Sequence, residues 1–193
     1  MRESFVHPND KGGVSAKKGN DAVNEFLKLC DSNNLHYEQC SEDEDKILHR
    51  DWRVEFPAIT TKNLPLGNLK VDVKSTKSNR RYQASAVDLV CLEVHGSWGD
   101  GWIKGNDDEN LIAFHLESKN LFYLISVKEL KAYLDKLQVE KVIDMDAKAQ
   151  IKTIGDYENF GIYRRSSYDK RFEKFMYVPL EHLLSNVKHF VLD

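Results

Sequence analysis

An aspartate and a lysine two residues apart are the side chains of this chain best suited to chemistry. They lie in Leu69-Lys70-Val71-Asp72-Val73-Lys74-Ser75, whose alternation predicts a short β-strand. Successive side chains of a strand point to opposite sides, so Lys70, Asp72 and Lys74 share one face. A carboxylate on that face can hold a hard cation, and an ammonium beside it can hold an anionic oxygen or a cation-bound water. Taken alone, the pattern favours a half-buried strand with a solvated, partly self-neutralised face, because short Asp-x-Lys patterns are common by chance.

Two further acidic residues precede this strand, on elements that can bring them to it. Asn20 is a typical N-cap, and an apolar stripe follows at helical spacing, which predicts a helix from about Asp21 to Asp31 with Glu25 near the border of the stripe. Asp51 opens an alternating segment that predicts a second strand. Asp72 follows Asp51 by 21 residues, a separation that suits two neighbouring strands joined by a loop.

Composition limits the class of protein that presents these residues. The 193 residues, 41% of them hydrophobic, suit one domain over 19–193, preceded by a flexible arm over 1–18. No apolar run approaches the roughly 18 residues of a membrane helix, and the first residues lack an apolar signal core, so we expect an intracellular, cytoplasmic protein. Three cysteines without Cys-x-x-Cys spacing and seven histidines without ligand spacing disfavour disulfides and zinc.

The remaining segments predict an α/β fold with a central mixed β-sheet flanked by helices. Residues 35–40 suggest the first strand, and the apolar run 88–94 a central one. Residues 111–117 and 121–125 predict a hairpin, and Ser126 with Glu129 forms a capping box for a helix to about Leu137. Residues 175–178 repeat this design as a strand before Pro179 and a second helix. We expect the elements after residue 111 to extend one edge of the sheet or to pack beside it.

In its order of elements the chain resembles the PD-(D/E)XK nuclease superfamily, the restriction-endonuclease-like fold. The resemblance covers residues 18 to about 95, so that a core of about 19–95 would be followed by an extension over about 96–193. Lys17-Lys18-Gly19 is similar to the basic-Gly entry to the family's first helix. Two features depart from the family pattern: Arg50 replaces the proline before the lone aspartate, and Asp72 stands where glutamate is also frequent.

The resemblance implies a metal-dependent nuclease that hydrolyses DNA, an endonuclease of phage, mobile-element, repair or recombination type. Glu25, Asp51, Asp72 and Lys74 would be catalytic. Asp51, Asp72 and the carbonyl of Val73 would bind Mg²⁺, with Mn²⁺ able to substitute, and Glu25 would act through water or a second metal. Magnesium prefers oxygen ligands and keeps several waters, so two carboxylates suffice to hold it. Lys74 would orient the attacking water and offset charge on the phosphate.

DNA is the partner that the resemblance implies, and a homodimer stays open because dimers are common among similar nucleases. The net charge of −3 gives no global basic signature, so contacts to nucleic acid must come from local clusters. The residues predicted to make them are Lys17, Lys18, Lys77, Arg80, Arg81 and Gln83.

Two other interpretations remain. A catalytically inactive protein of the same fold could bind nucleic acid or another protein, as the net charge and the long C-terminal half suggest. Alternatively, the match is accidental in a soluble α/β protein, which a large separation of Asp51 from Asp72 would establish. The glycine-rich loop from Trp98 to Trp102 could be a substrate loop or an interaction surface, and the sequence does not choose.

Overall fold

Two β-sheets and the helices that cover them make up the described part of the chain. The structure, a computed structural model, describes residues 14–41, 51–57, 65–79, 87–96, 99–104, 106–140, 144, 150–154, 157–166 and 172–193. The first sheet has six strands in the order β1-β2-β3-β7-β8-β12. The strands are β1 (His36–Gln39), β2 (Trp52–Phe56), β3 (Gly67–Ser75), β7 (Leu111–Leu116), β8 (Leu121–Ser126) and β12 (Phe190–Leu192).

The first sheet is mixed because β3 and β7 run parallel while its other neighbouring strands run antiparallel. The predicted α/β class with a mixed sheet is therefore confirmed. The expectation that strands after residue 111 extend one edge of the sheet or pack beside it is confirmed, since β7, β8 and β12 continue the sheet beyond β3. The residues of β7 are buried throughout because this strand lies between β3 and β8.

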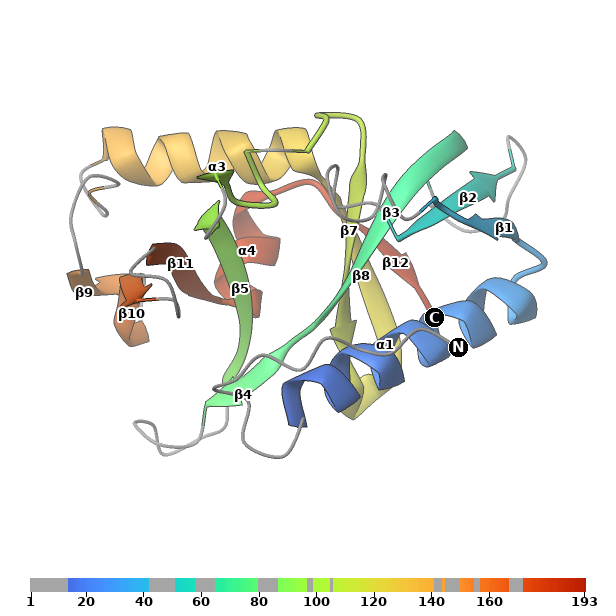
Figure 1. Cartoon of the computed structure of the whole chain (residues 1–193), viewed down its shortest axis with the longest axis horizontal. Helices are drawn as coiled ribbons and strands as arrows, with labels where there is room; N and C mark the ends of the chain where they lie inside the picture. The colour runs from blue at the N-terminus through green and yellow to red at the C-terminus, as the bar shows by residue number, and fades with distance from the viewer. Residues whose placement is uncertain are drawn as a thin grey trace.

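Helix α1 (Val14–Ser32) covers one face of this sheet (Figure 1). Ala22, Phe26 and Cys30 are fully buried at a spacing of four residues, and they pack on Val71 and Val73 of β3. The helix begins seven residues before the predicted start, so residues 14–18 are not part of an arm and Asn20 is not its N-cap. The predicted start is too late because the apolar stripe marks only the part of the helix that packs on the sheet. Polar residues before the stripe are helical as well.

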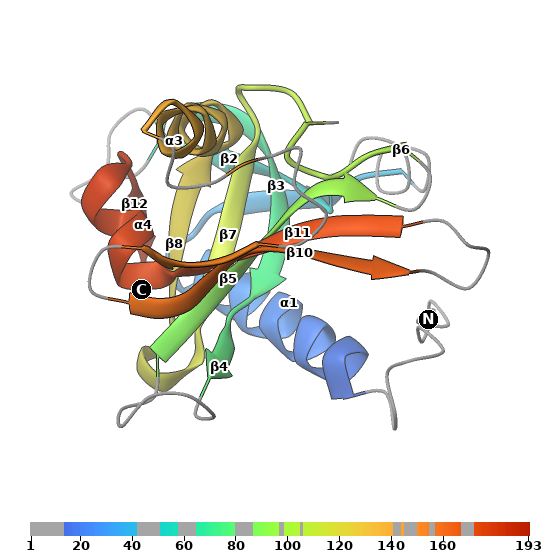
Figure 2. The same cartoon turned by 90° about the vertical axis from the view of Figure 1, so that its left-hand side faces the viewer.

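The opposite face carries the second sheet together with α3 (Val127–Val139) and α4 (Leu180–Asn186) (Figure 2). The second sheet has the order β4-β5-β11-β10-β9, and β6 pairs with β5. Its strands are β4 (Lys77–Asn79), β5 (Val87–Gly96), β6 (Gly99–Asp100), β9 (Gln150–Ile154), β10 (Tyr157–Ser166) and β11 (Phe172–Pro179). The apolar run predicted as a central strand, β5, is an interior strand of this second sheet.

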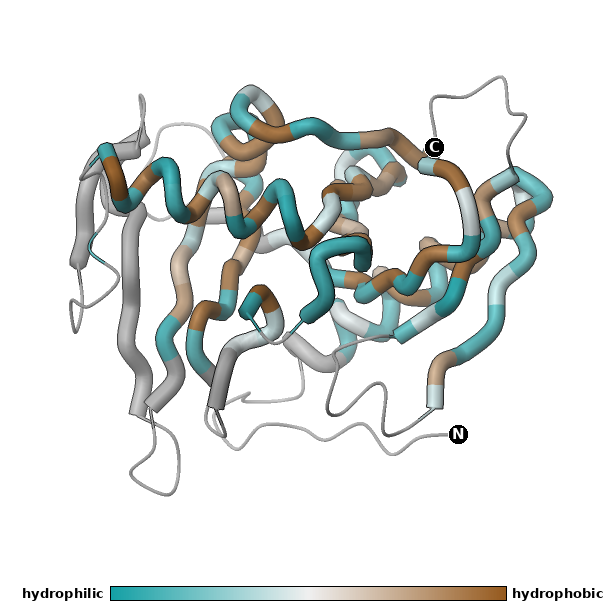
Figure 3. The backbone as a smooth tube through the Cα atoms, turned by 90° about the horizontal axis from the view of Figure 1, so that it is seen from above, coloured by the Kyte–Doolittle hydropathy of each residue, from teal (hydrophilic) through white to brown (hydrophobic). Residues whose placement is uncertain are grey.

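Two hydrophobic cores result, one on each face of the first sheet. Strand β7 serves both, since Leu111 and Ala113 pack with α1 while Ile112 and Phe114 pack with the second sheet. Figure 3 shows that hydrophobic and hydrophilic residues also alternate along the helices, as in helices that pack on one side. No helix in the described ranges is long and apolar enough to cross a membrane.

The predicted hairpin and both strand-to-helix junctions are confirmed. Strands β7 and β8 are joined by the 3₁₀ turn η1 (Glu117–Lys119) and by Asn120, which has a left-handed φ of 48°. The Ser126 side chain accepts a hydrogen bond from the backbone N–H of Glu129, as a capping box requires. Pro179 stands at the N-cap of α4.

Candidate functional site

Asp51 directly precedes β2. At this point β3 continues toward Ser75 beyond its last pairing with β2. The N–H of Asp51 donates to the carbonyl of Val71 at 3.1 Å, and its carbonyl accepts from Cys40 at 3.1 Å. Its side chain turns toward β3, where Oδ2 accepts the backbone N–H of Val73 at 2.9 Å. Asp51, just before β2 begins, therefore takes the place of a strand neighbour for β3.

Asp72 and Lys74 project from β3 on the face that meets the second sheet. Lys74 Nζ lies 2.8 Å from Asp72 Oδ2, which forms an ion pair. The Asp72 side chain is 2% exposed, whereas that of Lys74 is 32% exposed. The pair thus has a buried anionic end and a solvent-accessible cationic end.

Asp51 and Asp72 form a carboxylate pair whose charge is only partly compensated. Burial raises the pKa of Asp72 well above its ordinary value; the Lys74 ammonium opposes this shift, and the Asp51 carboxylate adds to it. Burial alone would lower the pKa of Lys74, but Asp72 and then Asp51 outweigh it, so the pKa of Lys74 is raised. The buried Oδ2 of Asp72 has the Lys74 ammonium as its partner at 2.8 Å. The Asp51 carboxylate beside Asp72 is repulsive toward it, and a bound cation would relieve that repulsion.

Trp102 lies beside the Lys74 ammonium, and sequence reasoning did not assign it to the site. Its ring centroid is 5.7 Å from Lys74 Nζ, and the side chain is 5% exposed. Gly101 lets the backbone before Trp102 approach β5 closely. A Cβ at this residue would lie 2.3 Å from the carbonyl oxygen of Glu93 on β5. The glycine-rich pattern was the available signal, and a close backbone approach is one reason for such a glycine.

Glu93 is a second residue that the sequence did not single out. Its charge contributes to the raised pKa of Lys74, after the charges of Asp72 and Asp51. Glu93 lies on β5 of the second sheet. No local sequence pattern predicts that this sheet packs against β3.

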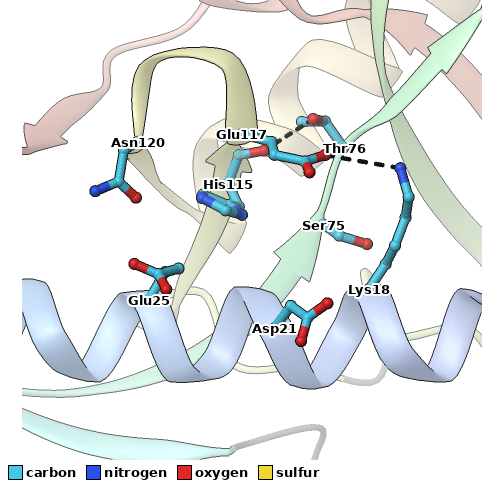
Figure 4. Close-up of a pocket in the computed structure, with 8 residues that line it drawn as sticks. All are labelled: Lys18, Asp21, Glu25, Ser75, Thr76, His115, Glu117 and Asn120. Carbon is cyan, nitrogen blue, oxygen red and sulfur yellow. Dashed lines mark hydrogen bonds and ion pairs between the residues drawn. The ribbon is translucent and has the colours of Figure 1, made fainter.

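Glu25 does not join this group. It lies on α1, which packs on the other face of the sheet, and it pairs with Lys28 at 2.6 Å. It faces His115 of β7, which shares its face with Ser75 and not with Asp72 (Figure 4). The structure thus brings Asp51, Asp72 and Lys74 together, while the predicted convergence of Glu25 on them is not found.

The predicted contacts to nucleic acid are only partly described. Lys17 and Lys18 are exposed in the first turns of α1, and Lys18 Nζ lies 3.7 Å from Glu117. Lys77 opens β4, and its side chain lies outside the described part. Arg80, Arg81, Gln83 and Trp98 also lie outside the described residues.

The oxygen atoms around Asp51 and Asp72 determine whether this site could bind a metal ion. Among the residues that the structure describes, no three or more His, Cys, Asp or Glu side chains are grouped to hold a metal ion. Asp51 and Asp72 offer two carboxylates, and the carbonyl of Val73 is a third oxygen. The N–H and C=O of one strand residue point to the same side, so this carbonyl faces the Asp51 side of β3.

Comparison with solved structures gives a distant structural likeness. No family model matches the chain, and no curated protein matches it. A solved structure, that of the bacterial homing endonuclease I-Ssp6803I, matches with a TM-score of 0.41 and 19% sequence identity. The match covers 59% of this chain and 66% of that one, slightly less than two thirds of its length.

Proposed function

We propose that the chain is a magnesium-dependent nuclease that hydrolyses phosphodiester bonds of DNA as an endonuclease. The observation that carries the proposal is the buried Asp72–Lys74 ion pair beside the Asp51 carboxylate, at a strand end where β3 extends past β2. Phosphodiester hydrolysis requires charge stabilisation and a positioned water more than covalent participation by the protein. Two carboxylates and an ammonium are suitable groups for both tasks.

The oxygen donors fit a hard divalent cation. The ligands would be Asp51, Asp72 and the carbonyl of Val73, and substrate oxygens and waters would complete the shell. The buried Asp72 carboxylate supports this assignment, because it lies next to a second carboxylate, Asp51, whose charge raises its pKa. A bound Mg²⁺ would supply Lewis-acid polarisation of the phosphate and a more acidic water.

Lys74 is the residue we expect to contact the reacting groups. Its partly exposed ammonium can donate to a phosphate oxygen or hold the attacking water, while Asp72 fixes its position from the buried side. Trp102 limits the other positions available to the ammonium. DNA as the substrate follows from the resemblance of these residues to the nuclease superfamily.

The alternative is an inactive member of the same fold that binds nucleic acid or another protein. Burial of Asp72 and its pairing with Lys74 favour it, because the same contacts would stabilise a site that holds no metal. Titration calorimetry distinguishes the two functions. Saturable Mn²⁺ binding that is lost in Asp72→Asn supports the nuclease, and DNA binding without metal binding supports the alternative.

The decisive experiment compares cleavage of supercoiled plasmid, branched DNA and single-stranded RNA in Mg²⁺ or Mn²⁺. Wild type is compared with Asp72→Asn, Lys74→Ala and the control Lys70→Ala, which removes a lysine from the same strand and face outside the ion pair. We expect DNA cleavage by wild type and Lys70→Ala, and its loss in the other two. Equal cleavage by all four proteins, or none on any substrate, contradicts the proposal.

A further inference from the structure

A second group of titratable residues lines a pocket on the α1 face, separate from Asp72 and Lys74. The pocket has a volume of about 350 Å³ and lies between α1, the end of β3 and the β7–β8 turn (Figure 4). This volume falls within the roughly 300–1,000 Å³ range typical of small-molecule sites. The lining residues are Lys18, Asp21, Glu25, Ser75, Thr76, His115, Glu117 and Asn120.

His115 is the buried group of this pocket, and one of its nitrogens lacks a partner. The residue is 7% exposed and stacks on Phe122 with ring centroids 4.5 Å apart, yet its Nε2 has no hydrogen bond. Burial lowers the pKa of His115, which keeps the ring neutral. Asn120 lines the pocket beside the ring and opposes the lowering of its pKa. A neutral imidazole has one nitrogen lone pair, which the buried Nε2 can offer to a ligand.

The charge around the pocket is negative even after its ion pairs are taken into account. Lys18 lies 3.7 Å from Glu117, and Lys28 lies 2.6 Å from Glu25. Asp21 has no such lysine among the described residues, so one carboxylate is left over. Figure 4 shows Glu25 directed from α1 toward His115, with Asp21 one turn earlier on the same side of the helix. A ligand with one positive charge and N–H donors complements this arrangement, whereas an anionic phosphate does not.

We propose that this pocket binds a small organic cation through a guanidinium or primary ammonium group, with the Asp21 carboxylate and His115 Nε2 as acceptors. The volume of the pocket accommodates more than a bare ion. The described side chains do not form a three-ligand metal group here, which disfavours an inorganic cation. The site is independent of the nuclease proposal and needs neither DNA nor magnesium.

Titration calorimetry and imidazole ¹⁵N NMR without DNA test this site, with methylguanidinium, spermidine and MgCl₂ as separate probes. Methylguanidinium represents an arginine-like group, and spermidine represents a free polyamine. We expect saturable one-site binding of at least one organic probe and a shift of the His115 Nε2 resonance. Absence of saturable binding by both organic probes overturns the proposal. Equal binding by MgCl₂ with the same resonance shift also overturns it, in favour of an inorganic cation site.

Two variants and a matched control locate the binding. Asp21→Asn removes the charge and keeps the shape, while His115→Phe keeps the ring stacked on Phe122 and removes the nitrogen acceptor. We expect each to weaken binding at least about tenfold, the effect of losing one charge-assisted hydrogen bond of about 1.4 kcal/mol or more. Asp135→Asn, an exposed position on α3, should bind as wild type does. Unchanged affinity in both pocket variants, with folding confirmed by circular dichroism, overturns the assignment.

Discussion

The two faces of the first sheet make opposite use of neighbouring positions on the same strands. On the face toward the second sheet, Asp72 and Lys74 neutralise each other within a buried ion pair and lie beside Asp51. On the face toward α1, Ser75 and His115 border an open pocket with excess negative charge. One step along a strand separates these environments, because side chains alternate with a period of two. Residues close in sequence can therefore serve different ligands.

The largest expected effect is on DNA cleavage, which should depend on the Asp72 face and not on the α1 face. Asp72→Asn should reduce DNA cleavage by on the order of 100- to 1,000-fold, as removal of one preorganised electrostatic partner of a transition state does. Glu25→Gln should change cleavage by no more than about twofold, as expected for a surface substitution remote from the chemistry. Single-turnover rates at saturating Mg²⁺ measure both. A loss in Glu25→Gln comparable to that in Asp72→Asn would show that the helix acid reaches the site and would remove the distinction between the faces.

Two glycine-to-alanine changes, one on each side of the first sheet, compare the two faces through the free energy of unfolding. At Gly101, a Cβ would lie 2.3 Å from a backbone oxygen of β5, so overpacking should destabilise the protein by about 1–3 kcal/mol. At Gly19, on α1, a Cβ meets nothing within 4 Å, so alanine should stabilise the helix by up to about 1 kcal/mol. Urea unfolding measures both values. Equal effects of one sign would contradict the close approach that brings Trp102 to Lys74.

Sequence reasoning reached the parts of the site that depend on local periodicity. It placed Asp72 and Lys74 on one strand face and Asp51 at the start of the neighbouring strand, and the structure brings these three together. The hairpin and the cap at Ser126 also follow from short patterns, and they are confirmed.

The parts that depend on which elements pack together were not accessible in this way. Glu25 was assigned from element order, but the face on which α1 packs decides where its acid lies, and that face is opposite Asp72. The strands after residue 111 were expected to extend one edge of the sheet or to pack beside it, but no local pattern indicated that β7 would pair with β3 across 35 intervening residues. Trp102 and Glu93 reach Lys74 only through contacts between the two sheets.

The smallest expected effect is a pH dependence of stability that belongs to the α1 face. Burial lowers the pKa of His115 below its ordinary value of 6.5, although Glu117, Glu25 and Asn120 act in the opposite direction. The unfolded chain then binds a proton more readily than the folded one as the pH falls below about 6.5. The contribution of His115 is therefore complete above that pH and is lost toward the lower, folded-state pKa, by about 1.4 kcal/mol for each unit of depression.

Urea unfolding between pH 7.5 and 5.0 measures this dependence in wild type and in His115→Phe, which keeps the ring contact with Phe122. The variant should lose less stability on acidification than wild type does. Some dependence should remain, because burial followed by the charge of Lys136 also lowers the pKa of His182 on α4. Identical pH profiles for the two proteins would show that His115 is accessible to protons in the folded state, and the pocket would then lack the neutral acceptor that distinguishes it from the Asp72–Lys74 face.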